Sequence, residues 1–294
     1  MFLLNLTHMK KDFIPIIIAY IAVFIVGGGL LCVLPYGVLV NTLVADIAAT
    51  FVIFAFGRVY KNSSFYDAYW SVIPPAIAAY WYYVLGTDAN AVRAMIVIAL
   101  TVWWGARLTI NWASHWEGMT HEDWRYPPIR ERAGKLAPLA DLMGIHMFPT
   151  LIVFASCLPI YAVMKYGSAP LGVFDYIAFA VTAAAILIET FSDIQLHNFI
   201  KIKEKGEFIK TGLWRYSRHP NYFGEFGFWF GLALCGLAAH PNGWMWIIPG
   251  AAAMGAMFAF VSIPLMDERS LASRDGYTEH MKRTSAFILW PPKA

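Results

Sequence analysis

A run of basic residues immediately before a predicted helix could bind an anion. The segment 212–225 reads Gly-Leu-Trp-Arg-Tyr-Ser-Arg-His-Pro-Asn-Tyr-Phe-Gly-Glu, and Pro220 suits the first turn of a helix. Arg215, Arg218 and His219 then precede a helix N-terminus, whose free N–H groups and positive dipole end attract anions. The sequence therefore favours a phosphate or carboxylate site here. The alternative is that these cations only anchor the helix at the membrane face.

Ionisable residues also occur inside the predicted membrane spans. A charge at the bilayer centre costs about 2.5–3.5 kcal/mol on insertion scales, so such residues are candidates for function. All but one lie towards the same leaflet, and a single arginine cannot neutralise their carboxylates, which weakens a purely structural interpretation. The exception lies nearer mid-span and is expected to be a structural hydrogen-bonding group. The mid-span residue is Asp46, and the others are Asp67, Arg107, Glu189, Asp193 and Glu225.

The sixth predicted span carries a polar stripe. Glu189, Asp193, His197 and Lys201 follow one another four residues apart, so they occupy one helix face. This face runs from the membrane out to the cytosol. The alternative is a row of contacts on a solvated helix end, and for His197 and Lys201 alone that alternative suffices.

Other patterns in the chain carry less chemistry. The His and acidic residues of the segment 115–123 match no helical metal-binding spacing, so we assign them to a solvated loop and predict no metal site. There is no dinucleotide-binding glycine motif after a strand and no phosphate-binding loop motif. Cys32, Cys157 and Cys235 all lie in apolar runs and suggest neither a disulfide framework nor a metal site.

The elements that must position these residues are membrane helices. Of 294 residues, 59% are hydrophobic and 14% are charged, whereas soluble domains have about 45–50% apolar and about 25% charged residues. The net charge of +3 is too small and too dispersed to suggest a nucleic-acid partner, and none is predicted. Runs of about 20 apolar residues can cross a bilayer, and the chain has eight candidates. They are 13–34, 38–57, 65–86, 91–114, 147–164, 171–196, 221–239 and 243–266.

The distribution of basic residues orients these spans. With eight spans, every Lys and Arg except Arg93, Arg107 and Lys165 falls on one side, so the positive-inside rule places both termini in the cytosol. The first span can be removed without disturbing this pattern. We therefore predict an all-α, polytopic transmembrane helix bundle. Residues 1–294 form one domain, with an extra N-terminal span in 1–37 and a seven-helix core in 38–294.

From about Val38 onward the chain resembles the steroid 5α-reductase C-terminal family, in its bacterial DUF1295-like branch. The resemblance is strongest in the segment 211–225 and in the closing run Tyr-Thr-Glu-His-Met-Lys-Arg-Thr-Ser-Ala-Phe-Ile-Leu from Tyr277. It implies seven core helices, NADPH held by the cytosolic loops and last helices, and reduction of a carbon–carbon double bond conjugated to a ketone. Isoprenylcysteine methyltransferases share an Arg-His-Pro-x-Tyr element and use S-adenosylmethionine.

The resemblance also assigns roles to residues. Asp193 matches the family acid at the end of the sixth span, Asn221 matches an asparagine beside the nicotinamide, and Glu225 matches the acid one turn later. Where the family polarises the substrate carbonyl with a Gln-Glu pair and a Tyr, this chain has Tyr66-Asp67 and Trp104. Burial raises a carboxyl pKa, so Asp67 is expected to act as the acid, with Tyr66 supplying a hydroxyl.

The resemblance therefore implies an integral-membrane, NADPH-dependent reductase of a lipophilic enone such as a 3-oxo-Δ4-steroid or an isoprenoid. Its cofactor site faces the cytosol, and no protein partner is implied. The catalytic candidates are Asp67, Tyr66 and Trp104. The cofactor-binding candidates are Arg107, Glu189, Asp193, His197, Lys201, Lys203, Arg215, Tyr216, Arg218, His219, Asn221, Tyr222, Glu225 and Glu268.

Two other functions stay open on the sequence. A methyltransferase would place the Arg-His-Pro element and Glu268 around the carboxylate and ribose of S-adenosylmethionine. A lipid-binding or scaffold protein without catalysis would make the intramembrane acids structural and would bind neither cofactor. The choice of cofactor distinguishes the three.

Overall fold

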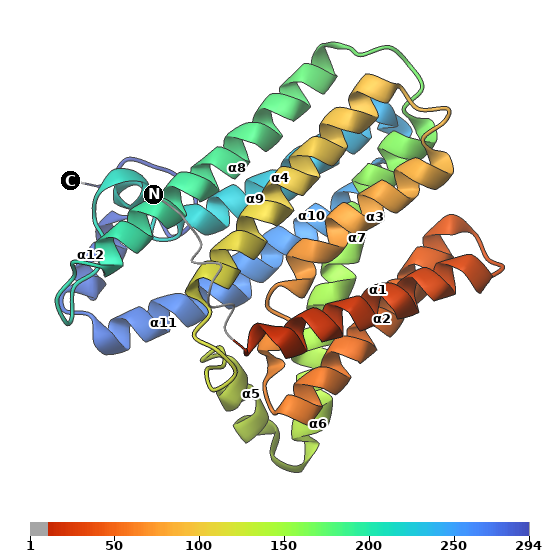
Figure 1. Ribbon diagram of the computed structural model, residues 1–294. Helices are drawn as coiled ribbons and strands as arrows, with labels where there is room; N and C mark the ends of the chain where they lie inside the picture. Colours follow the sequence, from red (N-terminus) through yellow and green to blue (C-terminus); the bar gives the residue numbers. More distant parts are fainter. Residues whose placement is uncertain (1–10, 294) are drawn as a thin grey trace. The chain divides into compact units, whose positions relative to one another are not determined.

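The computed structural model describes residues 11–293, and within them the chain is helical, without strands (Figure 1). This confirms the predicted all-α fold. The α-helices are α1 (Phe13–Val33), α2 (Val38–Tyr60), α3 (Tyr69–Leu85), α4 (Ala91–His115), α5 (Tyr126–Ala133), α6 (Ala137–Ala140), α7 (Phe148–Tyr166), α8 (Val173–Ile200), α9 (Pro220–Ala239), α10 (Trp244–Met257), α11 (Ile263–Ser273) and α12 (Tyr277–Arg283).

Seven helical segments in the described chain are long and apolar enough to cross a membrane, against eight expected. The difference is the predicted span 65–86. The 3-10 turn Ser63–Phe65 ends at the first residue of this span, and α3 begins only at Tyr69 and has 17 residues. At 1.5 Å per residue it is about 26 Å long, slightly short of the hydrocarbon thickness of about 30 Å. The chain is thus a multi-pass membrane protein.

The described chain divides into two compact units. Unit 1 runs up to residue 77 and adds residues 105–154, whereas unit 2 comprises 78–104 and everything from residue 155. The boundary therefore cuts α3, α4 and α7. Helix α1 belongs to the same unit as α2, and the organisation into one domain with an added first span stays a prediction.

In unit 1, α1 packs along α2. Ile16, Ala19 and Val23 of α1 are buried at helical spacing. The N-terminal end of α1 is fixed because the carboxylate of Asp12 accepts a hydrogen bond from the backbone N–H of Met119 at 3.2 Å. This first span is an integral part of unit 1.

In unit 2, α8 and α9 lie side by side (Figure 1). Glycines on α9 permit the close approach. A Cβ at Gly224 would lie 2.7 Å from the backbone nitrogen of Glu189, and one at Gly231 would lie 2.8 Å from the Cα of Thr182. Small residues at the crossing of membrane helices allow this kind of backbone contact. The packing fixes Glu189 and its neighbours against the first turns of α9.

Helix α9 begins where the sequence indicated. Pro220 is its first residue and His219 its N-cap. Proline is favoured there because its missing N–H would be unpaired in any case. The loop before α9 turns back along α8, since the Gln195 side chain accepts the backbone N–H of Leu213 at 2.8 Å. The indole N–H of Trp214 also donates to the Ser192 carbonyl at 3.0 Å.

Candidate functional site

One carboxylate, Asp267 on α11, organises the polar end of unit 2. It accepts hydrogen bonds from Arg218 Nε at 3.2 Å and Arg218 Nη2 at 2.6 Å. His219 Nε2 lies 3.0 Å away and the Tyr277 hydroxyl donates from 2.7 Å. Asp267 is 6% exposed and Tyr277 is 3% exposed. The buried carboxylate thus joins the loop before α9 to α11 and α12.

The other edge of Arg218 secures the C-terminal chain. Its Nη1 donates to the carbonyls of Met281 and Thr284 at 3.2 and 2.7 Å. Four of its five N–H donors are therefore engaged inside the protein. The predicted contact of Arg218 with a ligand phosphate finds no support in this geometry, because the guanidinium is buried and already paired. His219 shares this internal role through Asp267.

Asp193 and Asn221, two residues predicted for the cofactor, do come together. The Asn221 side-chain amide donates to Asp193 Oδ1 across α8 and α9 at 3.4 Å, and both residues are half-buried. Glu189 lies one turn earlier on α8 and is buried beside Gly224. His197 is half-buried one turn beyond Asp193. The polar stripe predicted on this helix therefore faces the first turns of α9 at Glu189 and Asp193.

Both carboxylate oxygens of Glu225 accept hydrogen bonds inside the protein. Its two oxygens accept the indole N–H groups of Trp104 at 2.8 Å and Trp229 at 2.7 Å. Glu225 is 2% exposed, and Trp104 is fully buried and stacks on Phe228 with ring centroids 4.4 Å apart. The N–H that Trp104 would offer a substrate carbonyl is thus engaged by another predicted site residue.

The remaining candidates in unit 2 surround this framework at its surface. Lys201, Lys203, Arg215, Tyr216 and Glu268 are exposed. The first three belong to the loop 201–215, which folds back along α8. This loop presents its cations to solvent at the end of the unit that holds Asp193 and Asn221.

Tyr222 lies between two rings, stacked on His219 at 5.6 Å and on Phe258 at 5.1 Å between centroids. It therefore packs on the face of the histidine that Asp267 holds. Burial and the neighbouring Asp267 raise the pKa of the Tyr277 hydroxyl to about 12. Burial, with the positive charge of Arg218 nearby, lowers the pKa of His280 to about 4. Both groups are neutral at physiological pH.

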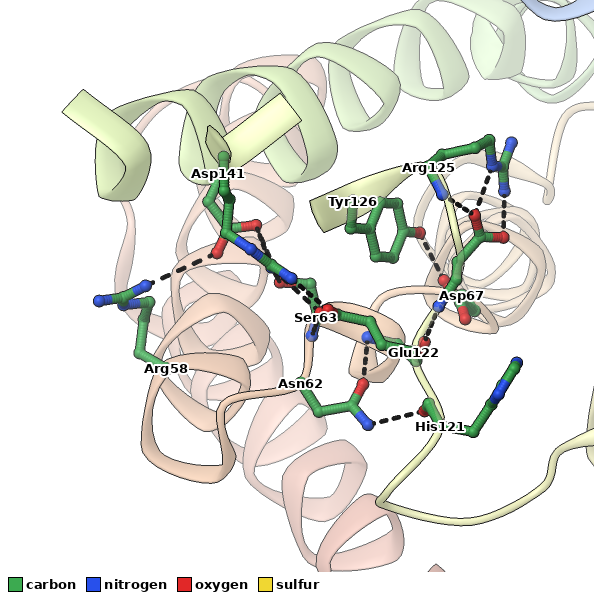
Figure 2. A network of polar contacts seen from close by, with 12 residues as sticks. Arg58, Asn62, Ser63, Asp67, His121, Glu122, Arg125, Tyr126 and Asp141 are labelled. Atoms are coloured by element: carbon green, nitrogen blue, oxygen red, sulfur yellow. Dashed lines mark hydrogen bonds and ion pairs between the residues drawn. The ribbon is translucent and has the colours of Figure 1, made fainter. Parts of the chain in front are cut away.

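In unit 1, Asp67 lies in the loop between α2 and α3, outside the spans. The Tyr126 hydroxyl donates to its Oδ1 at 2.5 Å, as Figure 2 shows. Burial raises the pKa of Asp67 to about 6, although the hydrogen bond from Tyr126 acts in the opposite direction. The carboxyl therefore titrates near neutral pH, as a general acid should.

Tyr66, the neighbour of Asp67, belongs to a different group of hydrogen bonds. Its hydroxyl and that of Thr150 are 2.8 Å apart, and Thr150 meets Thr50 at 3.0 Å. Beyond Thr50, the Tyr69 hydroxyl lies 3.5 Å away and donates to Asp46 Oδ1 at 2.7 Å. A buried line of hydroxyls thus runs from Tyr66 to Asp46. This confirms the expected hydrogen-bonding role of Asp46.

A cluster of charges lies beside Asp67 in unit 1 (Figure 2). Glu122 accepts the backbone N–H of Ser63 at 2.6 Å and Arg130 Nη1 at 3.0 Å. The Ser63 hydroxyl donates to Asp141 Oδ1 at 2.8 Å, and Asp141 is 1% exposed. The expectation that the segment 115–123 is merely a solvated loop is wrong at Glu122, because Arg130 and Ser63 hold its carboxylate.

The last candidate, Arg107, is half-buried on the part of α4 that belongs to unit 1. Its predicted contact with the cofactor stays a prediction. Among the described residues, no group of three or more His, Cys, Asp and Glu side chains could hold a metal ion.

Sequence reasoning missed Asp267, Tyr277 and Tyr126, which carry much of this geometry. One signal for Asp267 was present, since it directly follows the apolar run that ends at Met266. An acid at the end of a membrane helix must find a partner. Nothing local marked Tyr126 as the donor to Asp67, which is 59 residues away in the chain.

Comparison with known proteins gives a family without an assigned activity. The family model described as "Protein of unknown function (DUF1295)" matches residues 53–284. An uncharacterized protein of Schizosaccharomyces pombe is 28% identical over 213 residues, which are 64% of this chain and 61% of the yeast protein. The chain thus spans less than two thirds of that relative. No solved structure matches.

Proposed function

The chain belongs to the DUF1295 family, and from that premise we propose that it is a membrane reductase that uses NADPH to reduce a lipophilic enone. The expected substrate is a 3-oxo-Δ4-steroid or an isoprenoid with a carbon–carbon double bond conjugated to a ketone. The steroid 5α-reductase resemblance of the segments 211–225 and 277–289 suggests this chemistry. The positive charge of the loop 201–215 in unit 2 and the hydrogen bond to Asp67 in unit 1 support it.

The charge of the loop 201–215 is the observation that carries the proposal. Its five basic residues are all exposed, and Glu204 and Glu207 are its acids. A positive surface of this kind attracts a dinucleotide with several phosphates. It disfavours S-adenosylmethionine, whose sulfonium is itself positive. The five are Lys201, Lys203, Lys205, Lys210 and Arg215.

The neighbouring polar groups fit the uncharged end of the same cofactor. The Asn221 amide, aligned by Asp193 at 3.4 Å, can exchange hydrogen bonds with a carboxamide such as that of nicotinamide. Arg218 and Asp267 support this arrangement because they fix the loop from which α9 starts. Lys201, Lys203 and Arg215 are assigned to phosphate, and Arg218 and His219 are positioning residues.

The proposed reaction requires hydride addition at the β-carbon and a proton for the ketone side of the substrate. Bound NADPH supplies the hydride. Asp67 in its neutral form donates its proton to the ketone oxygen, where negative charge develops, and solvent then restores the proton of Asp67. The enol formed in this way tautomerises to the saturated ketone, gaining a proton at the α-carbon and releasing the one on oxygen. A carboxyl with a pKa of about 6 is suited to this role, and general acid catalysis contributes about 10²–10⁴-fold.

Tyr66 is the second residue assigned to the carbonyl of the substrate, through its hydroxyl. Its Oη is held by Thr150 at 2.8 Å, so the phenol keeps a fixed orientation through the chemical step. Holding a catalytic group in place removes an entropic cost from the barrier. Trp104 has its N–H on Glu225 and is assigned to shaping the helix packing in unit 2.

An S-adenosylmethionine-dependent methyltransferase of the isoprenylcysteine type is the second candidate. The exposed carboxylate of Glu268, which could bind a ribose, favours it. We further propose that α3, whose 17 residues reach the lower limit for a spanning helix, crosses the membrane as well, so that both termini and the cofactor site face the cytosol. We also propose that the protein acts without an obligate protein partner. This orientation is proposed because the loop 201–215 is basic and the positive-inside rule places basic loops in the cytosol.

The proposal is tested with the full-length protein in lipid nanodiscs, supplied with NADPH and a panel of enones. Deuterium at the transferable position of the nicotinamide should appear at the β-carbon of the saturated product. Asp67→Asn should lower kcat by about 10²–10⁴-fold, whereas Asp88→Asn, at an exposed site, should not. Methyl transfer, or no label in any product, would overturn the proposal.

A further inference from the structure

Helix α7 and the helical residues before it are together longer than one crossing of a bilayer requires. Residues Tyr126–Tyr166 form one helical segment of 41 residues, which Gly134 and the π-helical turn Asp141–Met147 interrupt. Laid end to end it would be about 60 Å long, against a hydrocarbon thickness of about 30 Å. Its second part, α7, has 19 residues, about 28 Å, which is close to the hydrocarbon thickness. The first part, up to Met147, carries the charged residues Arg130, Glu131, Arg132 and Lys135 and is not needed to cross the hydrocarbon core.

This first part nevertheless exposes large apolar side chains. Leu136 is 65% exposed, Leu139 54%, Met143 50% and Ile129 37%. Gly134, at φ 53°, ends α5 and lets the chain change direction. After it, Leu136, Leu139 and Met143 follow at spacings of three and four residues, so they form one helical stripe. An apolar stripe of this kind needs a cover.

Basic residues accompany the stripe. Arg132 and Lys135 are exposed between Ile129 and Leu136, with Glu131 as the exposed acid. At the end of α2, which packs against the π-helical turn Asp141–Met147, Val59 is 76% exposed. Lys61 follows it and is also exposed. Exposed apolar and basic side chains therefore occur both in residues 129–143 and at the end of α2, which packs against the π-helical turn.

From these observations we propose that residues 129–143 form an interfacial surface that binds anionic phospholipids. The apolar stripe enters the boundary between headgroups and acyl chains, and Arg132 and Lys135 contact phosphate groups of the lipids. Helices that lie in the interface plane carry this combination of an apolar face and basic residues. The long aliphatic stems of Arg and Lys let them cover apolar surface while their charges reach the headgroups.

The surface is held in place before any lipid arrives. Arg130, on the same helix as Arg132, is fixed by Glu122 and Ser63. Tyr126, at the start of this helix, is hydrogen-bonded to Asp67 (Figure 2). Because these contacts fix α5 on both sides, little ordering has to be gained when lipid binds. Ile129 and Arg132 of the lipid-binding surface thus share α5 with Tyr126, the donor to Asp67.

The test uses a fluorescent label at a single cysteine and lipids that quench it. Cys32 is exposed and is first replaced by serine, whereas Cys157 and Cys235 are buried. Leu139→Cys then places the label on the stripe in the full chain. Nanodiscs are made from phosphatidylcholine and phosphatidylglycerol, with bromine on the acyl chains of one lipid or the other. No catalytic activity is measured, so the outcome does not depend on the proposed function.

We expect brominated phosphatidylglycerol to quench the label more strongly than brominated phosphatidylcholine. In Arg132→Glu/Lys135→Glu this preference should fall by at least about fivefold, the effect of one basic residue near an anionic surface. The control Lys205→Glu/Lys293→Glu makes the same change of net charge at exposed sites of unit 2 and should preserve it. Equal quenching by both lipids, or none by either, would overturn the proposal.

Discussion

The polar groups of the two units are used in opposite ways. In unit 2, most of the basic and acidic residues of the segment 212–225 are paired with other side chains inside the protein. Arg218 pairs with Asp267, and Glu225 accepts two indole N–H groups. In unit 1, Asp67 has one phenol donor and a pKa raised to about 6. In its neutral form this carboxyl holds a proton that it can donate to a ligand.

This difference indicates which residues support a site and which act in it. A charge that is buried and fully paired contributes mainly to architecture, because changing its partner leaves an uncompensated charge. A carboxyl that titrates near neutral pH is a candidate for proton transfer. The segment 212–225 is therefore interpreted as the support of unit 2, with Asn221 and Arg215 as its ligand-facing members.

Asp267→Asn gives the sharpest test of this comparison. It leaves the Arg218 guanidinium buried without its carboxylate, so we expect the free energy of unfolding to fall by about 3–5 kcal/mol. Denaturant titration of the detergent-solubilised protein measures it. The matched control is Glu268→Gln, the next residue, which is exposed and should change little. Equal stability of the two variants would show that the Arg218 pair is not architectural.

The pH dependence of stability should differ in sign between the units. The raised pKa of Asp67, about 6, means that the folded state holds this proton when the unfolded state has lost it. Asp67 therefore stabilises the protein fully below about pH 4, and this contribution is lost as the pH rises to about 6. The lowered pKa of His280, about 4, destabilises the protein as the pH falls from about 6.5 to about 4.

Melting temperatures measured across pH 4 to 7 test both contributions. Relative to the parent protein, Asp67→Asn should remove a slope that falls with rising pH. His280→Gln should remove a slope that rises with it. If both variants changed the pH dependence of the melting temperature in the same direction, the account would be wrong. It requires that folding favours the protonated form of Asp67 and the deprotonated form of His280.

Thr150→Val tests whether the hydrogen-bonded hydroxyls between Tyr66 and Asp46 stabilise the protein together. It removes the partner of both Tyr66 and Thr50, so we expect a loss of about 1–3 kcal/mol in the free energy of unfolding. Thr101→Val in unit 2 is the control, because the buried Thr101 hydroxyl donates to the carbonyl of Val97 within its own helix. Its cost should be clearly smaller. Equal losses would mean that the line of hydroxyls has no special value.

The smallest effect is expected from Lys282→Ala. The ion pair of Lys282 with Glu279 has side chains 65% and 70% exposed, against 8% for each partner of the Arg218–Asp267 pair. Solvent screens exposed pairs, so the change in the free energy of unfolding should stay below about 1 kcal/mol. A loss comparable to that of Asp267→Asn would show that burial does not separate the two pairs.

Much of the fold could be predicted because hydropathy and proline placement act locally. The start of α9 at Pro220 follows from such signals, whereas the family resemblance singles out Asp193 and Asn221 together. The span 65–86 was overextended because the 3-10 turn at Ser63–Phe65 leaves no trace in hydropathy. The partners of Arg218 and Asp67 are 49 and 59 residues away in the chain. Tertiary packing alone brings them together, so spacing could not identify them.

The most direct test of the central claim is thermal stabilisation of the detergent-solubilised protein by NADPH, NADH and S-adenosylmethionine, measured side by side. A ligand at about 100 times its Kd stabilises the folded state by about 2.7 kcal/mol. We predict that NADPH raises the melting temperature and that S-adenosylmethionine does not. Lys201→Glu/Arg215→Glu should abolish the NADPH effect. Stabilisation by S-adenosylmethionine alone, or by neither cofactor, would contradict the account.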